Sequence, residues 1–194
     1  MEKSFNEQES LRLIGEMLEN TKARFNENGF FFLLWGWLVL TASLLHFILL
    51  RTGFLHPYIG WPIIMIGGGI VSGIVGYKRG KDAKVITFID SSMSYLWIGF
   101  VISFMILFVI VILGHIKWSL LSILIMALYG LPTFVSGGIL KFKPLIYGAL
   151  ACWAIAIISL FVKDDYVILL SAFSVIFAYL IPGYMLKAKF NKNV

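Results

Sequence analysis

The chain has 194 residues, of which 60% are hydrophobic and only 13% are charged, and its formal net charge at pH 7 is +6. A soluble domain carries about 25% charged residues, so this composition excludes an ordinary soluble protein. The basic residues lie in turns between long apolar runs, which is typical of cytoplasmic loops and excludes a nucleic-acid-binding patch. The single cysteine, Cys152, excludes a disulfide within the chain.

Residues 1–28 are polar and precede the first apolar run. The residues from Ser4 to Glu7 fit a capping box at the start of a helix. An apolar stripe then recurs at helical spacing, which predicts an amphipathic cytoplasmic helix over residues 5–25. The stripe consists of Leu11, Ile14, Leu18 and Phe25.

Six apolar runs follow, and each approaches the length needed to cross the roughly 30 Å hydrocarbon core of a bilayer. We therefore expect an all-α membrane domain over residues 29–186, with six transmembrane helices arranged as three hairpins, and a basic cytoplasmic tail over residues 187–194. Residues 85–89 are expected at the membrane interface, with Asp90 or Ser91 capping the third span. The predicted spans cover about residues 30–50, 58–77, 93–114, 118–140, 145–162 and 166–186.

The distribution of Lys and Arg predicts the orientation. Thirteen of these 16 residues lie in alternate segments, namely the N-terminal region, the second loop, the fourth turn and the tail. Only Arg51, Lys117 and Lys163 lie in the other turns. The positive-inside rule then places both termini in the cytoplasm.

The fourth span contains the best candidate for a polar pocket. Pro132 lies in its middle, where proline removes a backbone donor and frees a carbonyl that nearby hydroxyl groups can satisfy. Tyr129 and Thr133 supply such hydroxyls, and Tyr179 occupies the corresponding Tyr-x-x-Pro position in the sixth span. A proline kink without a ligand is the alternative interpretation.

Small residues form a stripe on the second span. Gly68, Ser72 and Gly76 share one face, and Gly69 with Gly73 forms a GxxxG motif. Such faces allow two helix backbones to approach closely, so we expect central packing or a homodimer interface here.

Residues that carry chemistry are scarce. His46, His56 and His115 all map to the extracytoplasmic end and are weak candidates for metal ligands, without a recognisable spacing motif. Asp, Glu, Lys and Arg are absent from the predicted span cores, which disfavours a charge-coupled transporter. Hydrolase and nucleotide-binding motifs are also absent, so we expect neither an enzyme nor a cofactor.

Two segments resemble those of small six-span bacterial inner-membrane proteins without an assigned activity. They read LPTFVSGGILKFKPL at residues 131–145 and FAYLIPGYMLKAKF at residues 177–190. The resemblance implies a multi-pass protein of the bacterial inner membrane and carries no functional residues over.

Two functions fit these features. The first is a non-catalytic signalling or scaffold module that binds a cytoplasmic protein partner through its N-terminal helix. Residues 1–28 hold six acidic and four basic residues, so anionic lipid would gain little from this segment. Its apolar stripe suits helix-in-groove docking to a partner or packing on the protein's own bundle. The second function is a channel or facilitator for a small neutral or lipophilic solute.

The predicted topology is testable with reporter fusions. Fusions after Lys81 and Lys192 should report a cytoplasmic location, and a fusion after Asp164 should report a periplasmic one, because the charge asymmetry sets the orientation. A periplasmic signal at Lys192 would require an odd number of spans and would contradict the topology.

Overall fold

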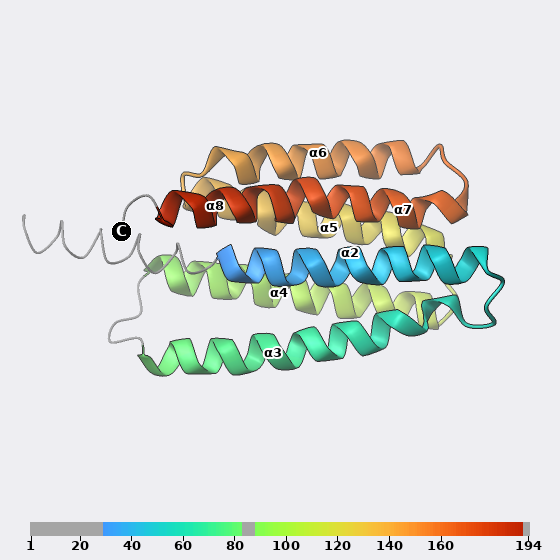
Figure 1. The fold of residues 1–194 in the computed structure, drawn as a ribbon, viewed down its shortest axis with the longest axis horizontal. Coiled ribbons are helices and arrows are strands. Elements are labelled where there is room, and N and C mark those ends of the chain that lie inside the picture. The colour runs from blue at the N-terminus through green and yellow to red at the C-terminus, as the bar shows by residue number, and fades with distance from the viewer. Residues whose placement is uncertain (1–28, 83–87, 192–194) are drawn as a thin grey trace, which may run out of the picture.

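The computed structural model of the chain describes residues 29–82 and 88–191, and the helices of this part lie side by side along one long axis (Figure 1). Their bounds are α2 Gly29–Arg51, the short 3-10 turn η1 Pro57–Ile59, α3 Gly60–Asp82, α4 Phe88–Ile112, α5 Trp118–Ile139, α6 Lys143–Ser159, α7 Asp164–Val175, the π-helical turn η2 Ile176–Leu180, and α8 Ile181–Asn191.

Five helical rods are long and apolar enough to cross a bilayer, whereas α6 is shorter. The sequence predicted the fifth span over residues 145–162, but α6 has 17 residues and is therefore about 26 Å long. It begins earlier than expected because Pro144 occupies the first turn, where proline is favoured. It ends earlier because residues 160–162 form a turn. This length is below the roughly 30 Å thickness of the hydrocarbon core, so length alone does not identify α6 as a transmembrane span.

The start of α4 differs from the predicted one. The helix begins at Phe88, so the prediction that Asp90 or Ser91 caps a span starting near Met93 is wrong. Asp90 instead lies in the first helical turn, where a carboxylate interacts favourably with the helix dipole. The Ser92 hydroxyl donates to the Phe88 carbonyl at 2.8 Å, as hydroxyls inside a helix do.

The last rod is interrupted by one π-helical turn, η2, between α7 and α8. The main-chain N–H of Ile181 donates to the Ile176 carbonyl, five residues earlier. Pro182 follows directly and has no N–H to continue the α-helical pattern. A π turn beside a proline is a recognised way to accommodate such a break.

The centre of the bundle is formed by the last rod together with α2, α5 and α6. The buried share of the most apolar stretch is 61% in the last rod and 44% in α5, but only 11% in α3 and 6% in α4. Among the described elements, α3 has main-chain neighbours only in α2 and η1, and α4 only in α5. The closest packing joins α5 to α6 and α2 to α7, so it crosses the boundaries of the three predicted hairpins.

Glycine permits the closest approaches between these central helices. A Cβ atom at Gly148 of α6 would collide with the main-chain carbonyl oxygen of Phe177 in η2. A Cβ atom at Gly130 of α5 would collide with the indole of Trp153, whose Nε1 donates to the Ala127 carbonyl at 3.0 Å. The indole of Trp153 therefore packs directly against the main chain of α5, which is possible because residue 130 has no side chain.

Replacing Gly148 with alanine should destabilise the protein. The added methyl group meets main-chain atoms that cannot rotate away, and overpacking of this kind costs roughly 1–3 kcal/mol. Thermal unfolding in mild detergent should show a lower midpoint for Gly148→Ala. Gly99→Ala on α4 is the matched control, since no atom lies within 4 Å of its Cβ position. Equal midpoints for the two variants would contradict the close approach.

Candidate functional site

Hydroxyl groups connect three central helices deep in the bundle. Ser43 of α2 and Ser171 of α7 are buried, and their Oγ atoms lie 3.1 Å apart. The Ser171 hydroxyl donates to the Ile168 carbonyl at 2.6 Å. Because that bond uses its only proton, Ser43 must be the donor in the bond between the two serines.

Tyr129 of α5 joins the same network from the other side. Its phenolic oxygen is hydrogen-bonded to the Ser174 hydroxyl, one turn beyond Ser171 on α7. Ser174 donates to the Ser171 carbonyl at 2.8 Å, so Tyr129 donates to Ser174. Thr133, one turn along α5, donates to the Tyr129 carbonyl at 2.8 Å.

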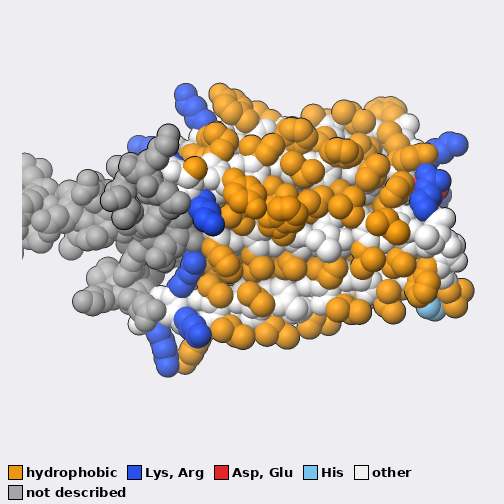
Figure 2. Space-filling view, viewed as in Figure 1, with side chains coloured by type: hydrophobic (Ala, Val, Ile, Leu, Met, Phe, Trp, Pro, Cys, Tyr) orange, Lys and Arg blue, Asp and Glu red, His pale blue; other side chains and the backbone are white. Residues whose placement is uncertain are grey.

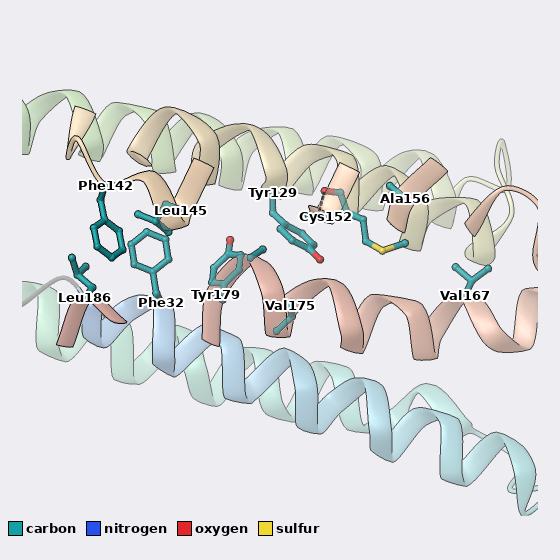
Figure 3. Packing of buried hydrophobic residues seen from close by; sticks show 12 residues of the cluster. Phe32, Tyr129, Phe142, Leu145, Cys152, Ala156, Val167, Val175, Tyr179 and Leu186 are labelled. Carbon is teal, nitrogen blue, oxygen red and sulfur yellow. Dashed lines mark hydrogen bonds between the residues drawn. The ribbon is translucent and has the colours of Figure 1, made fainter. Parts of the chain in front are cut away.

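Cys152 of α6 completes the polar contacts of this region. Its buried thiol donates to the Met126 carbonyl of α5 at 3.2 Å, the bond drawn in Figure 3. A thiol is a weak donor, and a buried cysteine is usually a small packing residue. We therefore refer to Ser43, Tyr129, Thr133, Cys152, Ser171 and Ser174 as the polar network.

The direction of the donors limits what the polar network can do. Each donated proton leads, directly or through one further hydroxyl, to a main-chain carbonyl of a helix. Its donors are therefore satisfied internally and are not aligned from hydroxyl to hydroxyl, as continuous proton transfer would require. The arrangement is suited to holding α2, α5, α6 and α7 together, a common use of polar side chains between membrane helices.

The structure brings together the four residues of the predicted pocket. The rings of Tyr129 and Tyr179 are 5.5 Å apart in an edge-to-face arrangement, and Pro132 and Thr133 are fully buried next to them on α5. Tyr129 and Tyr179 are each only 6% exposed, and Figure 3 shows them among packed side chains between the helices. Their convergence therefore produces close packing at this position.

The glycine-rich face of α3 packs against α2 at one end and has no neighbour among the described residues at the other end. Gly68 is buried, and its Cβ position would collide with Leu38 of α2. Ser72 is partly buried, and its hydroxyl makes no hydrogen bond among the described residues. No neighbouring atom lies within 4 Å of the Cβ positions of Gly69, Gly73 and Gly76, so only the Gly68 end packs closely within one chain.

The histidines do not converge. Nδ1 of His46 accepts a hydrogen bond from Trp61 Nε1 at 3.0 Å, and His56 Nδ1 lies 3.1 Å from the Tyr58 hydroxyl. His115 lies in the exposed turn before α5. In residues 29–82 and 88–191, no group of three or more His, Cys, Asp or Glu side chains is arranged to hold a metal ion.

Sequence reasoning missed most of the polar network. Ser171 and Ser174 are three residues apart and thus share a helix face, which was the available signal. Ser43 carries no such signal, because its partner lies on a helix 128 residues later in the chain. The predicted partner-binding residues Leu11, Ile14, Leu18 and Phe25 lie outside the described residues.

The rods and their composition define the class of this protein. It is a multi-pass helical membrane protein, and residues 29–82 and 88–191 contain five helices long and apolar enough to cross a bilayer. Comparison of the chain with protein-family models, with curated proteins and with solved structures finds no match. The resemblance to small six-span bacterial proteins therefore identifies no family.

The contact between Tyr129 and Ser174 can be measured with a double-mutant cycle. Tyr129→Phe and Ser174→Ala should each lower thermal stability, and the double variant should lose less than the sum. The expected coupling is about 0.6 kcal/mol, the average for hydrogen bonds between membrane helices. Ser103→Ala is the control partner, since Ser103 donates only to Gly99 within α4. A zero coupling with Ser174 would contradict the interhelical bond.

Proposed function

We propose that this chain is a non-catalytic module of the bacterial inner membrane that presents its N-terminal segment to a cytoplasmic protein partner. The observation that supports this proposal is a contrast between two parts of the chain. In the described residues 29–82 and 88–191 the buried side chains pack against one another, whereas residues 1–28 hold an apolar stripe at helical spacing that needs a surface to cover it.

The interior of the bundle supports a structural role. The side chains of the polar network donate to main-chain carbonyls or to one another, and the rest of the core is largely aliphatic and aromatic. The buried Ser136 hydroxyl makes no hydrogen bond among the described residues. Met126, Thr133, Leu145 and Cys152 are completely buried there. Such an interior suits a rigid membrane anchor whose function lies at its surface.

The place where the N-terminal segment leaves the bundle also supports the proposal. Gly29 is the first residue of α2 and lies close to α8. A Cβ atom added at Gly29 would be 3.5 Å from the carbonyl oxygen of Gly183. The ends of α3 and α8 and the turn before α6 meet at this same end of the bundle (Figure 1). Figure 2 shows Lys and Arg side chains gathered there. The basic residues of these segments are Lys78, Arg79, Lys81, Lys141, Lys143, Lys187 and Lys189.

We propose six spans with both termini in the cytoplasm. The apolar run that contains α6 continues through the turn at residues 160–162, so residues 145–162 approach the length of a span. The alternation of basic and less basic segments requires that α6 crosses the membrane. The gathering of lysine at the end where α2 begins agrees with a cytoplasmic location of that end.

The facilitator alternative requires a passage near Pro132. The residues predicted to line that passage, Tyr129, Thr133 and Tyr179, pack against one another and are at most 6% exposed. A solute path through this position would need the central helices to separate, which favours the anchor function over the facilitator.

Site-specific crosslinking in cells tests the proposal. A photo-crosslinking residue at Ile14 or Leu18, on the apolar stripe, should capture one cytoplasmic protein from cells that carry the full chain. The same residue at Glu16, on the opposite face of the predicted helix, is the matched control and should capture it weakly.

Two results together would reject this function. The first is that crosslinks from Ile14 and Leu18 stay within the chain, for example to the basic residues at the start of α6 or the end of α8. The second is wild-type behaviour of cells after deletion of residues 1–25. The stripe would then serve only to pack against the protein's own bundle.

A further inference from the structure

A pocket of about 260 Å³ lies at the end of the bundle opposite to Gly29 (Figure 1). It opens between the last turn of α2 and the first turns of α5 and α7. Its wall combines an imidazole, an ammonium group, two hydroxyls and two carboxylates beside apolar side chains. These polar groups belong to His46, Lys117, Ser119, Ser122, Asp164 and Asp165.

One side of the pocket is suited to an anion. Lys117 is the N-cap residue of α5, and its side chain leaves the first turn of that helix uncapped. The free N–H groups of a first helical turn carry partial positive charge and bind phosphate readily. Lys117 and Ser119 also line the pocket, and an ammonium and a hydroxyl group are further donors for an anion.

His46 contributes a donor of fixed tautomer. Trp61 Nε1 can only donate, and it lies 3.0 Å from His46 Nδ1, so Nδ1 must be unprotonated. In the neutral ring the proton therefore resides on Nε2. The ring lines the pocket with this N–H as its remaining hydrogen-bonding group.

The other side of the pocket is suited to an ammonium group. Asp164 and Asp165 are the first two residues of α7, and both line the pocket. Among the described residues neither carboxylate is within salt-bridge distance of Lys117, although all three residues line the pocket. The pocket thus presents separate cationic and anionic groups to a ligand that carries both charges.

Aromatic residues place this pocket at the level of lipid headgroups. Trp118 and Tyr166 flank it in the chain and are 60% and 42% exposed, as expected for residues of an interfacial belt. Arg51 lies beside them, with its guanidinium 5.3 Å from the Phe47 ring centre and 5.1 Å from that of Tyr166. These contacts fix the end of α2 against the start of α7.

We propose that this pocket binds the headgroup of an ethanolamine phospholipid. The phosphate lies against Lys117 and the start of α5, and the primary ammonium donates to Asp164 and Asp165. A choline headgroup has no N–H to donate to these carboxylates, and a glycerol headgroup has no cation. The lipid is the source of the phosphoethanolamine group because the pocket opens at the membrane boundary.

Native mass spectrometry of the full chain tests this site. The protein is released from micelles that contain equal amounts of phosphatidylethanolamine, phosphatidylcholine and phosphatidylglycerol. We expect phosphatidylethanolamine adducts to dominate. The double variant Asp164→Asn with Asp165→Asn should reduce that preference about tenfold, the effect of losing a hydrogen bond to a charged group. Lys117→Ala should instead lower the adducts of all three lipids, because each of them carries the phosphate. Lys163→Ala is the matched control, because this lysine lies at the same end but does not line the pocket.

Helix-start substitutions can also disturb folding, so a second variant is needed. Ser122→Leu fills the pocket without removing a charge and should abolish the preference while thermal unfolding stays as in the wild type. Equal adducts of the three lipids in the wild type, or unchanged preference in Ser122→Leu and in the double aspartate variant, would overturn the site. Binding of soluble phosphoethanolamine without enrichment of the ethanolamine lipid would overturn the lipid assignment.

Discussion

A polar group left unpaired inside a membrane bundle is costly, and this constraint organises most of the centre of the structure. Among the buried hydroxyls of the described residues, that of Ser136 makes no hydrogen bond. The serine, tyrosine, threonine and cysteine side chains of the polar network donate to helix carbonyls either directly or through one neighbouring hydroxyl. Two of these contacts join different helices through hydroxyl pairs, at Ser43 with Ser171 and at Tyr129 with Ser174. Charged side chains, in contrast, lie at the helix ends, where water and headgroups can solvate them.

Small residues and the π turn explain why the last rod can occupy the centre. Gly148 allows α6 to approach the main chain at Phe177, inside the π turn itself. A π turn widens the helix, so its neighbour must offer a surface without side chains at that point. Pro182 imposes the break in the last rod, and Gly148 leaves room for the widened turn. The two residues therefore act together in packing α6 against the last rod. This arrangement also places the ring of Tyr179 against the ring of Tyr129, and the two rings pack together in the core.

The sequence predicted the helical rods well and their arrangement poorly. Run length and charge fixed the rods, and five of them are long and apolar enough to span a bilayer. Helix α6 begins at Lys143, two residues before the predicted span, because Pro144 is favourable inside a first turn, which a hydrophobicity pattern does not register. The convergence of Tyr129, Pro132, Thr133 and Tyr179 was expected, but a pocket was expected with it. Whether converging side chains leave a cavity depends on side-chain volumes from other helices, here α2 and α6, and no local pattern encodes that.

The two ends of the bundle differ in a way that follows from the same packing. At the end where α2 begins, basic residues outnumber the acidic Asp82 and Asp90, and the N-terminal segment that precedes α2 has a net negative balance. At the opposite end, Lys117 shares a pocket with Asp164 and Asp165, and both signs are present within about 260 Å³. A basic end attracts acidic or anionic partners in general, whereas a mixed pocket selects a ligand with two charges in a fixed order. The two proposed binding surfaces therefore lie at opposite ends of the bundle, and the buried residues between them pack against one another.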